Sequence, residues 1–141
     1  MSVSKRNLEG YMDLTAYEAL RRIEGLRHQM RGYMPLVYIC SPFSGAVDRN
    51  IKKAAKFCRF AVEQGCIPIA PHILFPQFMD DDVPEEHDLA LYMDIVLLTK
   101  CQELWVFGDI ISEGMAMEIA KAKSKGQVIR YFNNKCKEIF V

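Results

Sequence analysis

Short apolar runs alternate with longer segments of helical periodicity along most of this chain, and this alternation constrains the fold more than any other feature. Each run is rich in apolar and β-branched side chains, as expected of a strand that is buried on both faces. The runs are residues 36–40, 66–70, 103–107 and 128–132. The alternation predicts an α/β fold: a Rossmann-like or flavodoxin-like parallel sheet of four to five strands flanked by helices. Pro68 predicts an edge position for the second strand, because proline cannot donate a ladder hydrogen bond.

An extra helix is expected ahead of the first strand, from Thr15 to about Arg31. Thr15 and Glu18 have the spacing of a capping box, and apolar side chains then recur at helical intervals. Pro35 separates this segment from the first strand. We therefore expect an N-terminal helical extension over residues 1–35 and an α/β domain over residues 36–141. The apolar stripe of the extension predicts packing in a homodimer or larger homo-oligomer, or onto its own domain; its members are Tyr17, Leu20, Ile23, Leu26 and Met30.

Charge and composition exclude several classes of partner. The 18 basic and 18 acidic residues balance, so no net field favours a nucleic acid polymer or an anionic membrane. No apolar run approaches the roughly 20 residues that span a bilayer, and the sequence predicts a cytoplasmic protein. The five cysteines include no C-x-x-C pair and no histidine at zinc-like spacing, so we interpret them as reduced core thiols and expect no metal.

Residues 71–84 carry three prolines and the acidic run 80–82. This composition predicts a long connection with little structure of its own. The connection is interpreted either as a binding loop or lid, or as a solvated acidic loop. His72 stands at its start, where it is placed to hydrogen-bond a ligand or carry a proton, or simply to tie down the loop. A helix is expected from about Glu85 to Lys100, and His87, which lies on it, is interpreted as incidental.

The carboxyl ends of the first and third strands are the favoured ligand site, because open parallel sheets bind ligands at the topological switch point. Asp109 to Glu118 leads from the third strand into a helix that ends near Gly126. Ser112 is a natural N-cap, and the backbone around Gly114 favours an anion, although a cap alone is the commoner role. Glu118 lies one turn further on, at the border of the apolar stripe. Near a helix N-terminus its carboxylate is expected to stay ionised and to face a sugar carbon, whereas a solvated glutamate is the commoner case.

Other nucleotide chemistries find no support in the residues. Neither a Walker loop nor a G-x-G-x-x-G fingerprint follows the first strand. No nucleophile elbow is present, and the cysteines have no evident activating base in the sequence. Serine and cysteine hydrolases are therefore disfavoured, as is nucleoside triphosphate chemistry.

Four segments carry a resemblance to a known superfamily: VYICSPFSG, IPIAPHILFP, CQELWVFG and SEGMAMEI. They resemble the nucleoside 2-deoxyribosyltransferase and 2′-deoxynucleoside 5′-monophosphate N-hydrolase superfamily, and more closely its small bacterial and phage branch. The resemblance covers residues 36–132. It implies that Glu118 attacks the anomeric carbon of a small nucleoside or nucleotide and that Tyr38 orients this glutamate. It also implies that no organic cofactor is needed, and that the protein is a dimer or larger.

The resemblance assigns further residues. A serine six residues before the glutamate, here Ser112, implies a 5′-phosphorylated substrate. The turn after the first strand would supply phosphate donors and a wall for the base, although Pro42 departs from the hydrolase pattern; the turn residues concerned are Ser41, Phe43, Ser44 and Gly45. Asp94 is the nearest match to an aspartate that contacts the base or donates a proton, but it is off by about one position. Asp88 or the acidic run around Asp80 are the alternatives.

These inferences predict a retaining N-glycosidase or 2-deoxyribosyltransferase that forms a glycosyl-enzyme intermediate through Glu118. Two rivals remain open. One is a non-catalytic protein that senses or sequesters a nucleotide or a nucleotide-derived signal. The other is an assembly module in which the leading helix drives oligomerisation and the crevice is vestigial.

Overall fold

The computed structural model describes residues 14–29, 32–43 and 47–140. Two compact units are distinguished, residues 1–34 and residues 35–141. In the first unit, helix α1 extends over Leu14–Gln29, which confirms the leading helix. Met30, assigned to the apolar stripe of that helix, lies outside the described residues.

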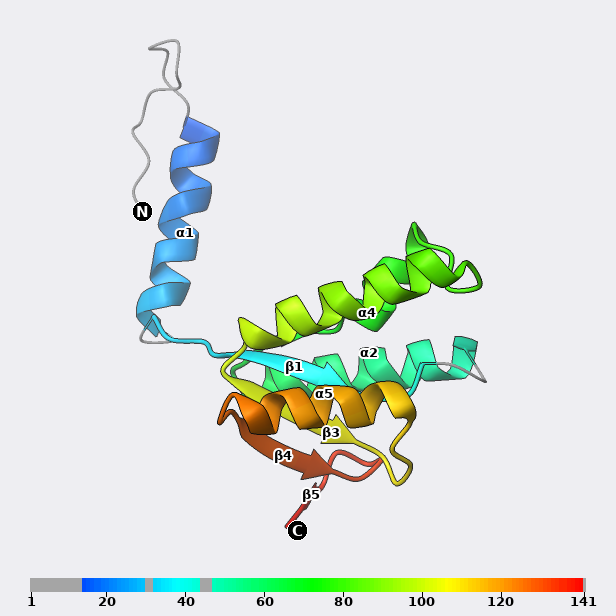
Figure 1. Ribbon diagram of the computed structural model, residues 1–141. Coiled ribbons are helices and arrows are strands. Elements are labelled where there is room, and N and C mark those ends of the chain that lie inside the picture. The colour runs from blue at the N-terminus through cyan, green and yellow to red at the C-terminus, as the bar shows by residue number, and fades with distance from the viewer. Residues whose placement is uncertain (1–13, 30–31, 44–46, 141) are drawn as a thin grey trace. The chain divides into compact units, whose positions relative to one another are not determined.

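The second unit is built on a five-stranded sheet in the order β2-β1-β3-β4-β5 (Figure 1). The first four strands are parallel, and β5 is antiparallel to β4. This order places the topological switch point between β1 and β3, and it confirms the flavodoxin-like sheet. The short strand β2 lies at one edge, as Pro68 predicts. The strands are β1 (Leu36–Cys40), β2 (Ile67–Ile69), β3 (Glu103–Phe107), β4 (Val128–Phe132) and β5 (Glu138–Ile139).

Helices cover both faces of this sheet because successive strand side chains point to opposite sides. On one face, Val37, Ile39 and Trp105 pack against α2 (Val47–Glu63) through residues such as Phe57. On the other face, a second core packs against α4 (Pro84–Thr99) and α5 (Glu113–Ser124). Figure 1 shows α5 in front of the sheet and α2 behind it. The second core contains Tyr38, Cys40, Leu98, Leu104, Val106, Met115 and Ala122.

The connection after β2 is more structured than the sequence predicts, and the prediction of an irregular loop over residues 71–84 is wrong. Two short helices follow one another there: α3 (Pro71–Leu74) and the 3₁₀ helix η1 (Phe75–Gln77). Prolines stand in the first turn of both. Proline is favoured at the first helical position for two reasons. An N–H group there would have no acceptor within the helix, so its absence costs no hydrogen bond, and the fixed φ of proline is close to the helical value. The same residues that suggest a loop therefore begin these helices.

The carboxyl-terminal tail adds the fifth strand, β5, which lies within the predicted four to five strands. A tight turn returns the chain, with Cys136 in the left-handed region at φ 61°. The Asn133 side-chain oxygen accepts hydrogen bonds from the N–H groups of Lys135 at 2.9 Å and Lys137 at 3.0 Å. Arg130 then donates two hydrogen bonds to the Glu138 carboxylate, at 2.9 and 2.7 Å. Within the described part of the chain, no helix combines the length and apolarity needed to cross a bilayer.

Candidate functional site

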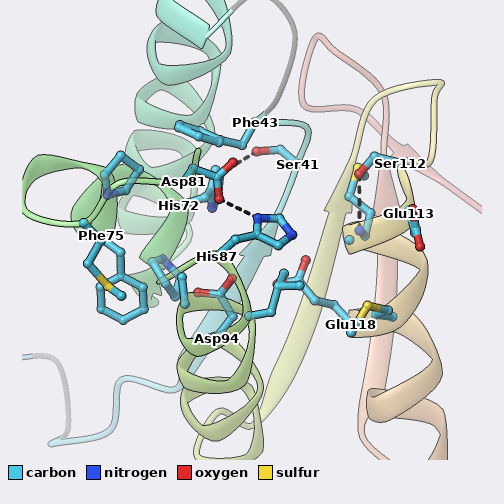
Figure 2. A pocket seen from close by; sticks show the side chains of 18 of the residues that line it. Ser41, Phe43, His72, Phe75, Asp81, His87, Asp94, Ser112, Glu113 and Glu118 are labelled. Carbon is cyan, nitrogen blue, oxygen red and sulfur yellow. Dashed lines mark hydrogen bonds and ion pairs between the residues drawn. The ribbon is translucent and has the colours of Figure 1, made fainter. Parts of the chain in front are cut away.

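A cavity of about 300 Å³ opens at the carboxyl end of β1, with α4 on one side and the start of α5 on the other. Its size is at the lower end of the range of small-molecule sites. Figure 2 shows Asp94 on α4 and Glu118 on α5 facing the same space. The polar residues of the lining are Ser41, His72, Asp81, Glu86, His87, Asp94, Ser112, Glu113 and Glu118, and Phe43, Phe75, Met79, Leu91 and Met117 are among the apolar ones.

The start of α5 fixes the position of Glu118. Ser112 is the N-cap, and its hydroxyl accepts a hydrogen bond from the Met115 N–H at 3.3 Å. Met115 and Ala122 then enter the core against the sheet. Glu118 lies next to Ala122 on the wheel of the helix, at the border of this buried stripe, and its side chain lines the cavity. The predicted cap and the predicted direction of Glu118 both agree with this geometry.

Two side chains from β1 contact Glu118. The Tyr38 hydroxyl donates a hydrogen bond to its carboxylate, and the Cys40 Sγ lies 3.5 Å from its Oε1. Tyr38 and Cys40 share one face of β1 because they are two residues apart, and both are buried. Burial and the nearby Glu118 charge raise the pKa values of the phenol and the thiol, so both keep their protons and act as donors.

The pKa of the Glu118 carboxyl group is raised, contrary to the expectation that the helix N-terminus keeps this group ionised. Burial raises its pKa to about 7, outweighing the hydrogen bonds from Tyr38 and Cys40, which lower it. The charge of Asp94 raises it further. Loss of water around a carboxylate is the larger effect here, because the stabilising field of a helix end falls off within the first turn.

Asp94 supplies a second carboxyl group with a similar affinity for protons. Burial, followed by the charge of Asp81, raises its pKa to about 7. Its Oδ1 atom is buried and has no hydrogen-bond partner among the described residues. The charge of Asp94 raises the pKa of Glu118, so ionisation of one carboxyl group disfavours ionisation of the other. A coupled pair of this kind can supply one ionised and one protonated carboxyl group to a ligand.

Two histidines complete the polar lining. His72 Nε2 lies 2.8 Å from the Ser41 hydroxyl oxygen, and burial lowers the pKa of His72 to about 4, so this ring is neutral. His87 Nδ1 lies 2.7 Å from Asp81 Oδ1. The hydrogen bond and charge of Asp81 raise the pKa of His87. Figure 2 marks both contacts.

The structure brings together most of the side chains that the sequence singles out. The lining includes Ser41, Phe43, His72, Asp94, Ser112, Gly114 and Glu118. Tyr38 reaches the site through its hydrogen bond to Glu118. Asp109 is exposed and is not part of the lining, and Ser44 and Gly45 lie outside the described residues. The described residues contain no group of three or more His, Cys, Asp or Glu side chains that could hold a metal ion.

The sequence missed His87 and Glu86 as site residues, and it indicated Asp81 only as part of the acidic run 80–82. A signal for His87 was present in the spacing of α4, where His87 and Asp94 are two helical turns apart and so share one face. Ala90 and Leu91, between them, line the same cavity. Asp81 and Glu86 carry no comparable signal, since their position depends on how α3 and η1 fold the preceding segment.

Comparisons with known proteins agree with this architecture. The solved structures that resemble the chain include a 2-deoxyribosyltransferase from the psychrotolerant bacterium Bacillus psychrosaccharolyticus, with TM-score 0.55 and 18% identity over 75% of this chain and 77% of that one. A 2-deoxyribosyltransferase from Leishmania mexicana has TM-score 0.51 and 15% identity, covering 70% of this chain and 64% of that one. At such identities the likeness establishes the fold.

Sequence comparison identifies a family but no characterised relative. None of the curated proteins matches the chain. The model of a family described as a domain of unknown function, DUF7768, matches residues 35–132. This match includes β1 to β4 and every described residue of the cavity lining. The chain therefore belongs to the DUF7768 family.

Proposed function

We propose that this protein cleaves or transfers the N-glycosidic bond of a nucleoside, a deoxynucleoside or a nucleoside 5′-monophosphate. The observation that carries the proposal is the arrangement of Glu118, held by Tyr38, in the same cavity as a second carboxyl group with raised pKa, Asp94. Most enzymes that cleave glycosidic bonds use two carboxyl groups in one site. The 2-deoxyribosyltransferase-like fold supports the same chemistry.

The reaction begins with the ionised Glu118 and the protonated Asp94. A Glu118 oxygen attacks the anomeric carbon, so that a carbon–oxygen bond forms while the bond to the base nitrogen breaks. The bonding electron pair leaves with the base, and Asp94 gives its proton to that base. The Tyr38 and Cys40 donors hold the Glu118 carboxylate in place for this attack. The product is a glycosyl-enzyme ester on Glu118 and a free base.

In the second half, water or another base attacks the same carbon and releases Glu118. Asp94, now ionised, takes the proton of the incoming nucleophile, which restores the starting state. Each of the two steps inverts the anomeric carbon, so the product has the same anomeric configuration as the substrate. Ser41, His72, Ser112 and the backbone at Gly114 supply hydrogen bonds for the sugar, and Phe43 supplies a wall for the base.

The decisive experiment uses the Glu118→Gln variant. It keeps the side-chain volume but removes the attacking charge, so turnover of a nucleoside panel should fall by at least about a thousandfold. Release of free base is measured by chromatography, with and without a second base as acceptor. Glu63→Gln, an exposed glutamate on α2, is the matched control and should keep wild-type rates. A folded Glu118→Gln protein with unchanged turnover would exclude Glu118 as the nucleophile.

A non-catalytic role in sensing or sequestering a nucleotide is the second candidate, and one observation favours it. Because burial raises the pKa of Glu118 to about 7, much of the protein carries a protonated and non-nucleophilic Glu118 at neutral pH. Tight binding of a nucleoside or nucleotide, with no release of free base at any pH and with any acceptor base, would support this function and exclude catalysis.

A further inference from the structure

We propose that the cavity selects nucleosides that carry no phosphate, either neutral or with a positively charged base, over nucleoside 5′-monophosphates. This inference rests on the proposed function for the premise that the ligand is an N-glycoside. It runs against the expectation that Ser112, by its place in the resemblance, favours a 5′-phosphate. It arises from the distribution of charge around the cavity.

Carboxyl groups dominate the lining. Five side chains contribute one each: Asp81, Glu86, Asp94, Glu113 and Glu118. Among the described residues of the lining there is no lysine or arginine. A 5′-phosphate brings a further charge of roughly −1.5 to −2 near neutral pH, and sites that hold phosphate side by side with carboxylates need cations to offset the repulsion.

The two histidines do not supply such a cation. His72 is uncharged, since burial lowers its pKa to about 4, and its Nε2 is engaged with Ser41. His87 is hydrogen-bonded to Asp81, so any positive charge it gains is matched by that carboxylate. The histidines therefore leave the net charge of the lining negative.

Carboxylates stand on both sides of the reacting centre at Glu118 and Asp94. Toward the start of α5, Glu113 follows Ser112, and Figure 2 shows the two residues next to one another. Toward the start of α4, the lining includes Asp81 and Glu86. The 5′ end of a sugar and its base point away from the anomeric carbon in different directions. Carboxylates at the start of both helices therefore disfavour a 5′-phosphate that lies against either one.

The N-terminus of α5 is the remaining feature that could attract an anion, but a hydroxyl and a carboxylate of the chain already interact with it. The Ser112 hydroxyl accepts the Met115 N–H, and Glu113 places a carboxylate in the first turn. An acidic residue there interacts favourably with the helix dipole and so reduces its attraction for a phosphate.

A second and independent observation concerns the buried Asp94 Oδ1, which has no hydrogen-bond partner in the described structure. A buried acceptor without a partner is costly, so the ligand gains by bringing a donor to it. Amino groups of a base and hydroxyl groups of a sugar are donors. A nucleoside and its monophosphate share the other base and sugar donors; they differ at the 5′ position, where a hydroxyl can donate to the Asp94 Oδ1 atom and a fully ionised phosphate cannot.

The experiment compares matched pairs that differ by the phosphate alone: each of four deoxynucleosides and its 5′-monophosphate. Binding is measured by calorimetry on Glu118→Gln, which does not consume the ligand, and kcat/KM is measured on the wild type. We expect at least one nucleoside to bind about tenfold or more tightly than its monophosphate, a difference of about 1.4 kcal/mol. Raising the ionic strength should strengthen monophosphate binding, because salt screens repulsion. Monophosphate binding that is tighter, and that weakens with salt, would overturn the inference.

Charge-neutralising variants identify the carboxylates responsible. Glu113→Gln or Glu86→Gln should narrow the difference between nucleoside and monophosphate several-fold, whereas Glu85→Gln, exposed and outside the lining, should leave it unchanged. If all three variants leave the difference unchanged, the carboxylates are not its cause and the inference fails. Turnover of monophosphates in preference to nucleosides would refute the inference and leave the glycosidase proposal intact. Absence of both binding and turnover for every pair would refute both.

Discussion

At the scale of single residues, the candidate site depends on the strand period along β1 and the helical period along α5, which together bring Tyr38, Cys40 and Glu118 into contact. The period of two along β1 gives Tyr38 and Cys40 the same face, and the second turn of α5 brings Glu118 to that face. The sequence identifies Tyr38, Glu118 and Ser112 because each follows from a local pattern or from the resemblance. It does not reveal the raised pKa of Glu118, because that property depends on how much water three separate elements exclude.

The Tyr38 hydrogen bond has a direct consequence for pH dependence. It lowers the pKa of Glu118 by stabilising the ionised form, so Tyr38→Phe should raise that pKa by roughly one to two units, as expected for a hydrogen bond to a charged group. Since the nucleophile must be ionised, the acidic limb of the kcat/KM profile should move to higher pH. Tyr92→Phe, exposed on α4, is the control. Equal profiles for both variants would show that Tyr38 does not act through Glu118.

At the scale of elements, the sequence predicts the strands closely and the irregular segments poorly. β1, β3 and β4 have the predicted bounds because buried parallel strands are continuous apolar runs between clear breakers. Prolines mislead over residues 71–77, where they begin short helices. Glu138 and Ile139 carry no strand pattern at all; their pairing depends on the turn at Asn133 and on the ion pair with Arg130, which no local signal reports.

The cap of α5 can be tested separately from catalysis. Ser112→Ala removes the acceptor for the Met115 N–H, so unfolding in urea should show a loss of about 1 kcal/mol of stability. Ser124→Ala, near the other end of the helix, should change stability by less than about 0.5 kcal/mol. The exposed Ser124 hydroxyl donates to the Lys121 carbonyl and does not cap an N–H group at the start of the helix. Equal losses in the two variants would contradict the capping role.

At the scale of the whole molecule, Glu118 links the site to stability. Its pKa is raised from 4.5 to about 7 in the fold, so the folded state binds this proton more tightly than the unfolded chain does. The resulting stabilisation is complete below about pH 4.5 and is lost as the pH rises to 7. Glu118→Gln cannot ionise. Its melting temperature relative to wild type should therefore be higher at pH 8 than at pH 5, and a difference independent of pH would argue against burial of this charge.

The apolar side of α1 leads to a prediction about assembly. Ile23 and Leu26 of its stripe are exposed, at 57% and 58%, and each large apolar side chain left in water forgoes roughly 1.5 to 3 kcal/mol. We therefore expect the full chain to form a homodimer or larger homo-oligomer through this helix. Light scattering on the full chain, and on a version starting at Gly32, tests the idea. Loss of an oligomer in the shortened protein is the expected result, and two monodisperse monomers would refute it.

The position of Trp105 determines what the tryptophan fluorescence of this protein reports. It is the single tryptophan of the chain, buried on the α2 face of the sheet with its indole N–H donating to Glu103 at 2.9 Å. The Arg130 guanidinium lies 4.8 Å from the centre of its ring. The cavity opens over the opposite face, beside Tyr38 and Cys40. We therefore expect tryptophan fluorescence to report the melting of the sheet, while a ligand that enters the cavity should leave the emission spectrum almost unchanged.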